Sequence, residues 1–410
     1  MIGRNRVVIT GLGVLAANGI GKEAFWNSLL AGESGIGPIT NFDARELPWQ
    51  CAGEIKNFDP LDFVERRHKP KRESRSSLLS VAAAKLAIED ANANETLLSK
   101  SDPVLITMGS TLSGLDLVET HNRRIESNGL NKGLLYVSTC LHIKTASIIS
   151  SYLGIPTQIG TISNSCSAGL DAIASAAAAI QDGRFEIAIA GGSDAGVIPS
   201  VVTGLGYAGL LSTNNNNPAA ACRPFDLSRT GGYLGEGAGV VILESLEHAL
   251  ERGAPVYAEV LGYNTTADYE GMECHGYELS MSRALMNANC MPEDISYINA
   301  HGSSSVQLDQ IETEAINRVF GTHANRIPVT SIKGATGNPL AGGSVMQIVS
   351  TVLSFANELI PQTTNLDVPD PLCRVDHIYG APRRFKADRA MINSRGVGGV
   401  NSSMVLKAFN

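Results

Sequence analysis

The 410-residue sequence predicts an α/β protein built from two similar halves. Short apolar runs that end in glycine or another small residue alternate with helix-like segments through most of the chain. The chain is also longer than a single typical hydrophobic core supports. A change in composition at Gly253-Ala254-Pro255 divides it into residues 1–253 and 254–410, and the second part repeats the first in outline.

Composition excludes several classes of function. Hydrophobic residues make up 43% of the chain and the formal net charge is −8, which argues against nucleic acid as a partner. The seven cysteines are scattered and form no CxxC pair, so we expect neither a disulfide framework nor a metal site. No uncharged apolar run reaches membrane-spanning length, and the first residues lack the apolar core of a signal peptide. We therefore expect a cytoplasmic protein without a membrane partner.

The first half is expected to begin with a buried strand that breaks at glycines. Its GxG pattern has no third glycine at dinucleotide spacing, so a Rossmann site is not indicated. In chain order we expect a strand at 6–14, a helix at 20–30, a helix at 76–91, a strand at 103–110, an irregular polar surface segment at 121–139 and a helix at 141–153.

Cys166 lies at a turn between a predicted strand that ends near Ile162 and an Ala-rich helix predicted over residues 167–181. At the first turn of a helix, free backbone N–H groups and the helix dipole favour the nucleophilic thiolate. The same N–H groups can hold the oxyanion of a thioester under attack. Cys166 is the only cysteine in such a turn. It is a candidate nucleophile, and the alternative is a small buried hydrophobe, as most free cysteines are.

A basic run stands out at residues 65–75 of this acidic chain. It holds six basic side chains, Arg66, Arg67, Lys69, Lys71, Arg72 and Arg75, against Glu65 and Glu73. One interpretation is a solvated face at the start of a helix. The other is a docking surface that attracts an acidic partner.

The glycine-dense segment 231–239 surrounds Glu236 and predicts tight packing about a buried, bonded carboxylate. In the second half, His301 follows a predicted strand at 295–300 and precedes glycine and serines. A lone histidine is more often structural than catalytic, but the carboxyl end of a strand is a favourable place for catalysis. The remaining elements expected are strands at 240–243 and 258–263, a helix at 246–252, a helix at 307–320, a strand from 329, a helix at 341–359 and, over 390–401, two strands joined by a glycine loop with Val397 at its tip.

Eight motifs together resemble the β-ketoacyl-[acyl-carrier-protein] synthases of the synthase I/II type, within the thiolase superfamily. They are VVITGLGV (7–14), SNSCSAG (163–169), AGGSDA (190–195), RPFD (223–226), GEGAG (235–239), NAHGSSS (299–305), SIKGATGN (331–338) and SRGVGGVNSS (394–403). They run in family order through nearly the whole chain. The resemblance implies the thiolase fold, with five layers in the order α-β-α-β-α and two similar halves.

The resemblance also implies a site and partners. It assigns Cys166 as nucleophile, His301, Asn338 and Lys333 as catalytic residues, Asp309 and Glu312 as supporting acids, the backbone N–H groups of Cys166 and Val397 as oxyanion hole, and Arg66, Arg67, Lys69 and Arg72 as the docking surface for an acyl carrier protein. No cofactor of its own is expected, because phosphopantetheine arrives on the carrier protein. A homodimer, or a heterodimer with a related ketosynthase-like subunit, is implied.

Three positions depart from the family pattern. Asn338 stands where the family motif K-x-x-T-G-H ends in histidine, serines 303 and 305 replace threonines, and the FGFGG loop reads Arg395-Gly-Val397-Gly-Gly. Asparagine can still donate a hydrogen bond but does not titrate. Ketosynthase III and chalcone-synthase-like enzymes use a Cys-His-Asn set for decarboxylative condensation. These changes favour a specialised pathway, such as type II polyketide assembly, over housekeeping fatty-acid elongation.

The predicted activity is acyl transfer to Cys166 followed by decarboxylative Claisen condensation with a malonyl thioester. One alternative is a non-elongating acyltransferase that passes the acyl group from Cys166 to another nucleophile. Another is a non-catalytic chain-length-type partner subunit. The presence of Cys166 argues against that alternative, since such subunits usually lack the cysteine.

Overall fold

The computed structural model describes residues 5–93, 98, 103–129, 137–268 and 274–409. One mixed sheet dominates it. The sheet contains β1 (Val7–Ala16), β2 (Gly19–Ile20), β5 (Val104–Gly109), β6 (Thr157–Ile162), β7 (Ile187–Ala195), β8 (Glu236–Ser245), β9 (Ala258–Ala267), β10 (Tyr297–Asn299), β11 (Pro328–Thr330), β13 (Asp376–His377), β15 (Arg389–Gly396) and β16 (Val400–Ala408). Two small sheets pair β3 (Ile36–Pro38) with β4 (Cys51–Gly53) and β12 (Leu359–Ile360) with β14 (Arg383–Arg384).

The helices lie on both faces of the main sheet. They are α1 (Lys22–Ala31), α2 (Arg75–Asp90), α4 (Leu115–Asn128), α5 (Lys144–Leu153), α6 (Ala168–Gln181), α7 (Pro199–Tyr207), α8 (Leu246–Glu251), α9 (His275–Asn287), α10 (Val306–Phe320), α11 (Lys333–Thr336) and α12 (Ala341–Asn357), with short 3-10 turns that include η2 (Arg66–His68), η3 (Pro70–Arg72) and η6 (Ser165–Ser167). In the part of the chain that the structure describes, no helix combines the length and the apolar character needed to cross a membrane.

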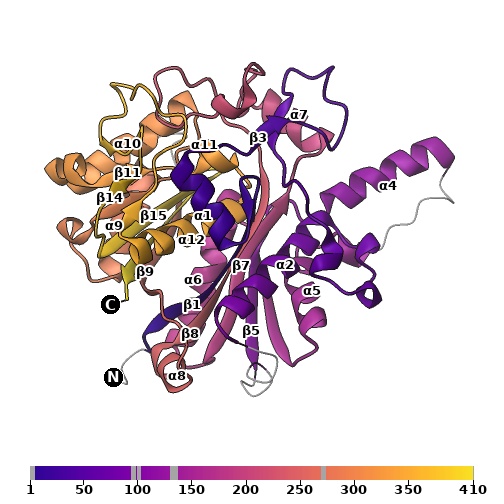
Figure 1. Ribbon diagram of the computed structural model, residues 1–410, viewed down its shortest axis with the longest axis horizontal. Helices are drawn as coiled ribbons and strands as arrows, with labels where there is room; N and C mark the ends of the chain where they lie inside the picture. Colours follow the sequence, from indigo (N-terminus) through magenta and orange to yellow (C-terminus); the bar gives the residue numbers. More distant parts are fainter. Residues whose placement is uncertain (1–4, 94–97, 99–102, 130–136, 269–273, 410) are drawn as a thin grey trace.

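The main sheet divides into two half-sheets, one ordered β6-β5-β7-β8-β1, with β2 beside β1, and the other ordered β9-β16-β15-β10-β11-β13. A short antiparallel pairing of β1 with β9 joins them, with Val8 opposite Glu259. Helices α2 and α5 cover the outer face of the first half-sheet, α6 and α12 pack together between the two half-sheets, and α9 with α10 beside it covers the second (Figure 1). This is the predicted layer order, α-β-α-β-α.

The central layer depends on small residues. Gly169 of α6 lies so close to α12 that an added Cβ would stand 2.3 Å from the carbonyl oxygen of Ala341. Gly109, at the end of β5, meets the backbone of Ala168 in the same way, at 2.2 Å. One cluster of buried apolar side chains contains members from both halves, for example Leu170 and Val349. The two halves therefore share a core, and the boundary at residue 253 stays a prediction.

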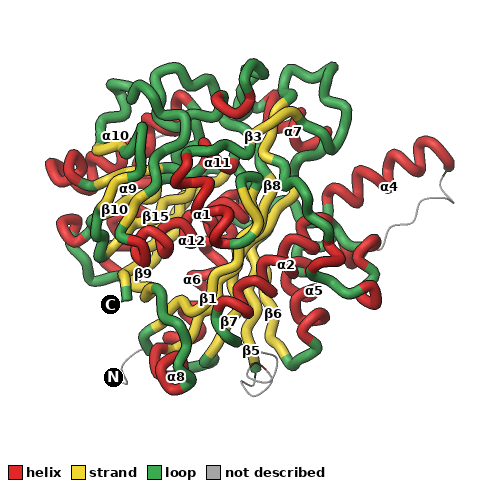
Figure 2. Tube along the Cα trace, viewed as in Figure 1, coloured by secondary structure: helices red, strands yellow, loops and turns green. Residues whose placement is uncertain are grey.

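The structure corrects the expectation of an irregular surface segment at residues 121–139. Its beginning belongs to α4, a helix that extends from the body of the molecule (Figure 2). Most of its side chains are polar, and apolar ones such as Val118 and Ile125 are only half-buried, so the polar composition favoured a surface segment over a helix. Residues 130–136 of the segment lie outside the described residues. Helices α7 and α9 were also not predicted.

Candidate active site

The turn that holds Cys166 lies between β6 and α6, as the sequence predicts. Ser165 adopts a left-handed φ of 54°, which bends the chain sharply before the cysteine. Strand β15 packs against this turn, since the Ser394 hydroxyl donates to the carbonyl oxygen of Cys166 at 3.2 Å. Gly396 follows so closely that an added Cβ would lie 2.8 Å from the Cβ of Ser165. The cysteine is thus positioned by both half-sheets.

Cys166 is 3% exposed. Burial raises the pKa of its thiol, while the hydrogen bond from Asn338 and the positive charge of Lys333 act in the opposite direction. The position at a helix start predicts a favoured thiolate, but burial is the largest influence on the pKa of Cys166 and acts against the thiolate. Cys166 is therefore a buried thiol, and its use as a nucleophile would require loss of the thiol proton.

His301 follows β10 and is also buried. The backbone N–H of Arg395 donates to Nδ1 at 3.3 Å, so Nδ1 carries no proton and the neutral ring bears its proton on Nε2. Burial lowers the pKa of His301 well below its usual value, and the nearby charges of Lys333 and Arg395 lower it further. His301 is therefore a neutral hydrogen-bond donor at neutral pH.

Two buried carboxylates on α10 hold the backbone around this histidine. Glu312 accepts hydrogen bonds from the N–H groups of His301 and Gly302, both at 2.8 Å, and from the Tyr277 hydroxyl at 2.9 Å. Asp309 accepts from the N–H of Ser303 at 2.9 Å. Burial raises the pKa of Asp309 to about 7 and also raises that of Glu312. Both acids contact the backbone of the histidine turn rather than the imidazole ring.

Lys333 begins α11 and is buried beneath the same turn. Its Nζ donates to the carbonyl oxygen of His301 at 2.6 Å. Burial lowers the pKa of Lys333 to about 8, against the raising effect of the acidic groups around it. Its charge favours a thiolate at Cys166 and disfavours an imidazolium at His301.

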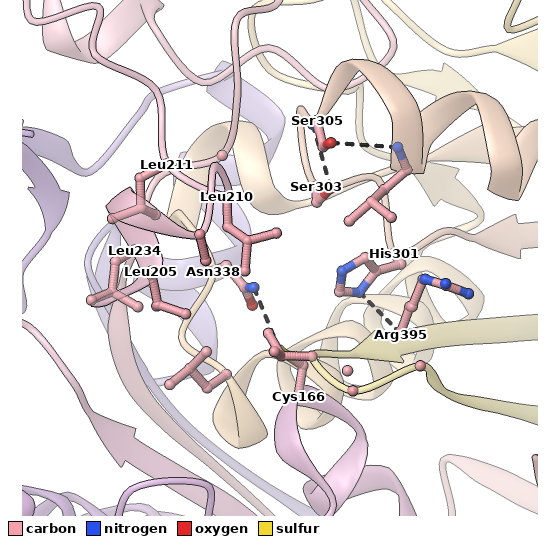
Figure 3. Close-up of a pocket in the computed structure, with 18 of the residues that line it drawn as sticks. Cys166, Leu205, Leu210, Leu211, Leu234, His301, Ser303, Ser305, Asn338 and Arg395 are labelled. Carbon is pink, nitrogen blue, oxygen red and sulfur yellow. Dashed lines mark hydrogen bonds between the residues drawn. The ribbon is translucent and has the colours of Figure 1, made fainter. Parts of the chain in front are cut away.

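Asn338 follows α11 and stands on the other side of the cysteine. Its backbone N–H donates to Tyr233 at 2.8 Å, which anchors it beside the segment before β8. Its Nδ2 lies 3.6 Å from the Sγ of Cys166, and its buried Oδ1 has no hydrogen-bond partner among the residues that the structure describes. The amide therefore points its donor group at the sulfur of Cys166 (Figure 3).

Cys166, His301 and Asn338 line one pocket of about 530 Å³ (Figure 3). In Figure 3 the labelled leucines lie across the pocket from Ser303, Ser305 and Arg395. We call the apolar lining the leucine wall (Leu205, Leu210, Leu211, Leu234 and Leu340) and the polar lining the polar wall (Ser303, Ser305, Asp268 and Arg395). Val397 lies at the pocket with its side chain 54% exposed. Its part in an oxyanion hole stays a prediction, as do the roles of the other residues.

Sequence reasoning missed Asp268 and the leucine wall. Asp268 follows β9 without any motif around it, and it reaches the pocket through its contact with Arg395. Three of the leucines lie in or just after α7, in a stretch that is apolar but rich in glycine. The apolar character of that stretch was the one signal that could have pointed to them.

The basic residues of the run at 65–75 have two different surroundings in the structure. Arg66, Arg67, Lys69 and Arg72 are exposed on η2 and η3. Arg75 instead pairs with buried Glu236, with two nitrogen–oxygen distances of 2.7 Å, which gives Glu236 the bonded, buried state that its glycine-rich surroundings predict. Among the described residues, no group of three His, Cys, Asp or Glu side chains is arranged to hold a metal ion.

Comparison with known proteins gives full-length matches. Residues 4–249 match the family described as "Beta-ketoacyl synthase, N-terminal domain", and residues 257–367 match "Beta-ketoacyl synthase, C-terminal domain". The chain is 35% identical to the 3-oxoacyl-[acyl-carrier-protein] synthase 2 of Synechocystis over 99% of both chains. It is 34% identical to a putative polyketide beta-ketoacyl synthase 1 of Streptomyces cyaneus, over 98% of this chain and 97% of that protein.

Solved structures of ketosynthases also superpose on this chain over its full length. The ishigamide ketosynthase/chain length factor superposes with a TM-score of 0.92 at 29% identity, over the whole of both chains. A type II polyketide ketosynthase in complex with its acyl-carrier protein superposes with a TM-score of 0.88 at 30% identity, over 99% of this chain and 100% of that one.

Proposed function

Because this chain belongs to the β-ketoacyl synthase family, we propose that it is a carrier-protein-dependent ketosynthase in which Cys166 carries the acyl group. One observation supports this most directly. The thiol of Cys166, the imidazole of His301 and the amide of Asn338 line the same pocket. In that arrangement a nucleophile faces two neutral hydrogen-bond donors.

The first step is thioester exchange. The sulfur of Cys166 attacks the carbonyl carbon of an acyl thioester, and the bond from that carbon to the carrier's phosphopantetheine sulfur breaks. The proton lost by the Cys166 thiol is taken up by the departing phosphopantetheine sulfur, which leaves as a thiol. Backbone N–H groups of Cys166 and Val397 hold the negative oxygen that forms during the attack. The positive charge of Lys333 favours the thiolate as the proton leaves.

The second step is decarboxylative condensation. A malonyl thioester loses carbon dioxide, and the electron pair of the broken bond passes to the α-carbon and the adjacent carbonyl oxygen. Nε2–H of His301 and Nδ2–H of Asn338 donate to that oxygen. The α-carbon then attacks the acyl group on Cys166, a carbon–carbon bond forms, and the Cys166 thiolate leaves and takes up a proton from solvent.

The leucine wall suits the acyl chain. Leu234 and Leu340 belong to the same apolar cluster as Cys166, and Leu205 packs against that cluster. Burying an alkyl chain against these leucines is favourable by roughly 25 cal/mol per Å² of apolar surface. The polar wall lies beside His301 and suits the amide-containing arm of phosphopantetheine.

The proposal includes an acyl carrier protein that supplies phosphopantetheine, so the enzyme needs no cofactor of its own. Exposed Arg66, Arg67, Lys69 and Arg72 form the basic surface, which attracts an acidic carrier protein. A relative solved with its acyl-carrier protein supports this choice of partner. The proposal keeps the cytoplasmic location that the composition predicts.

A second ketosynthase-like subunit is also part of the proposal. Strand β6 is the outer strand of the first half-sheet and is paired on one side, with β5. Ile159 in its middle is 37% exposed, an apolar side chain on an open edge. The similar structure described as a ketosynthase/chain length factor supports a related partner subunit.

The pathway we propose is specialised and resembles type II polyketide assembly. Asn338, Arg395 and Val397 depart from the residues of fatty-acid elongation enzymes. Matches to both fatty-acid and polyketide synthases at similar identity are compatible with this proposal.

Intact-mass spectrometry tests the loading step. Incubation with an acyl-carrier protein should add one acyl mass to the wild type and none to Cys166→Ala. Cys222→Ala is the matched control, because Cys222 is equally buried but donates to the carbonyl oxygen of Lys333 outside the pocket. Acylation that persists in Cys166→Ala would overturn the assignment.

A further inference from the structure

Arg395 forms a closed ring of buried polar contacts at the edge of the pocket. Its Nη2 donates to Oδ2 of Asp268 at 2.5 Å, and its Nη1 donates to Oδ1 of Asn401 at 2.6 Å. The ring closes because Nδ2 of Asn401 donates to Oδ1 of Asp268 at 2.8 Å. The side chains of Arg395 and Asp268 are 5% and 6% exposed, respectively. The ring is therefore an ion pair with an amide bridge, removed from solvent.

This ring encloses the glycine turn that joins β15 to β16. The backbone N–H of Asp268 donates to the carbonyl oxygen of Gly399 at 2.8 Å, and Nδ2 of Asn401 donates to the same oxygen at 3.1 Å. Arg395 and Asn401 face each other in the register of the two strands, just outside the turn. Gly398 and Gly399 have φ of 96° and 81°, so the turn has no side chains at these positions to fix it. Its position must come from outside contacts.

The end of β15, where this turn begins, contacts the imidazole of His301 and Ser165, the residue before Cys166. The backbone N–H of Arg395 holds Nδ1 of His301, and Gly396 packs on the residue before Cys166. The guanidinium group is already matched by a carboxylate and an amide, so its charge is compensated without a ligand. A buried ion pair contributes little net stability but strong directionality, which suits it to fixing a turn rather than to binding substrate.

We propose that Arg395 is a positioning residue, whose ion pair with Asp268 clasps the turn 396–399 and holds the N–H of Val397 toward the thioester oxygen at Cys166. This rests on the proposed function, since it assigns the clasp to acyl transfer. The family's FGFGG loop has aromatic side chains at positions 395 and 397. In this chain the ion pair between Arg395 and Asp268 holds the turn 396–399 in place instead.

The test compares two reactions of the same sulfur. Acylation of Cys166 by an acyl-pantetheine thioester passes through an oxyanion, whereas alkylation by iodoacetamide does not. In Asp268→Ala, and in the near-isosteric Asp268→Asn should the alanine variant not fold, the limiting rate of acylation should fall about tenfold to a hundredfold. The rate of alkylation and the KM for the thioester should change less than about twofold. Asp376→Ala, which breaks the pair with Arg383 far along the sheet, is the matched control and should change neither.

Combination and rescue sharpen the test. The double variant Arg395→Ala/Asp268→Ala should be acylated no more slowly than either single variant, because each substitution already breaks the same ion pair. Arg395→Lys should recover part of the rate, because lysine can still contact Asp268. Unchanged acylation in the Asp268 variants, or equal loss of acylation and alkylation, would overturn the clasp. A wild type that is alkylated but never acylated would instead overturn the proposed function, and the clasp's role with it.

Discussion

At the scale of single residues, the His301 side chain is arranged to donate a hydrogen bond rather than to accept a proton. Its Nδ1 is occupied by the backbone N–H of Arg395, and burial lowers its pKa well below the usual value. In the proposed mechanism, the neutral imidazole of His301 and the amide of Asn338 both donate a hydrogen bond to the substrate carbonyl oxygen. This explains in physical terms why asparagine can stand at position 338, since a donor that does not titrate meets the need.

Replacing Asn338 should separate the two steps of the reaction. In Asn338→Ala we expect loading of Cys166 to stay nearly intact while condensation with a malonyl thioester falls about a hundredfold, because one of two donors to the developing oxyanion is lost. Asn338→Asp should be at least as slow, since a carboxylate accepts where a donor is needed. Single-turnover rates of loading and of condensation, measured separately, check this.

Equal loss in both steps would contradict the role given to Asn338. Unchanged condensation in Asn338→Ala would contradict it as well. Asn365→Ala is a suitable control, because Asn365 donates to the carbonyl oxygens of Ala219 and Cys222 away from the pocket.

Lys333 should control the pH range of His301. Lys333→Met removes a nearby positive charge, so the imidazolium becomes less unfavourable and the pKa of His301 should rise toward its usual value. Activity is lost as pH falls through that pKa, because a protonated Nδ1 no longer accepts from Arg395. The acid limb of the condensation rate should therefore move to higher pH. A limb that stays in place, or moves to lower pH, would contradict this, and Lys386→Met, at an exposed pair with Glu358, should not move it.

At the scale of elements, the site depends on the contact between α6 and α12. Gly169 permits this contact, because an added methyl group would overlap the carbonyl oxygen of Ala341. The N–H of Leu170 also donates to the Ser344 hydroxyl at 3.1 Å. The helix that begins just after Cys166 is therefore anchored on the second half of the chain.

A pair of glycine substitutions tests this anchor. Gly169→Ala should destabilise the protein by about 1–3 kcal/mol, because the overpacked backbone cannot relax without moving a helix. Gly204→Ala, in α7 where an added Cβ meets nothing within 4 Å, should be neutral or stabilise by about 0.5–1 kcal/mol. Denaturant unfolding measures both. Equal effects of the two substitutions would contradict the role of Gly169.

Residue patterns close in sequence predicted a helix or strand correctly where the segment's buried face matches its apolar residues. The unit of β6, the Cys166 turn and α6 follows from β-branched residues, a polar turn and an Ala-rich run, all close in sequence. Helix α4 is not predicted, because its few apolar residues are outnumbered by polar ones. Arg75 has the same charge as its neighbours in the basic run, but its partner Glu236 lies 161 residues away. Such distant pairing depends on the tertiary fold and leaves no local signal.

At the scale of the whole molecule, the pocket exists only where the two halves meet. Cys166 comes from the first half, while His301, Lys333 and Asn338 come from the second. The shared core and the pairing of β1 with β9 hold them together. The exposed basic surface, by contrast, belongs to the first half alone.

Charge reversal of that surface should slow acylation by the carrier protein without slowing the reaction at Cys166 itself. With Arg66, Arg67, Lys69 and Arg72 changed to Glu, acylation by an acyl-carrier protein should fall tenfold or more, while acylation by a small pantetheine thioester should change little. Added salt should weaken the wild-type reaction with the same selectivity. Equal losses with both donors would mean that the surface has a structural role only.

The most direct test of the central claim is the fate of a malonyl group on the acyl-loaded enzyme. Wild-type protein acylated at Cys166 is mixed with malonyl-carrier protein labelled with ¹³C in its free carboxyl group, and carbon dioxide and the masses of both proteins are followed together. We predict that labelled carbon dioxide is released, that Cys166 returns to its free mass and that the carrier protein gains a 3-oxoacyl group, one for one. An acylated Cys166 that never releases labelled carbon dioxide would contradict the ketosynthase assignment and favour a non-elongating acyltransferase.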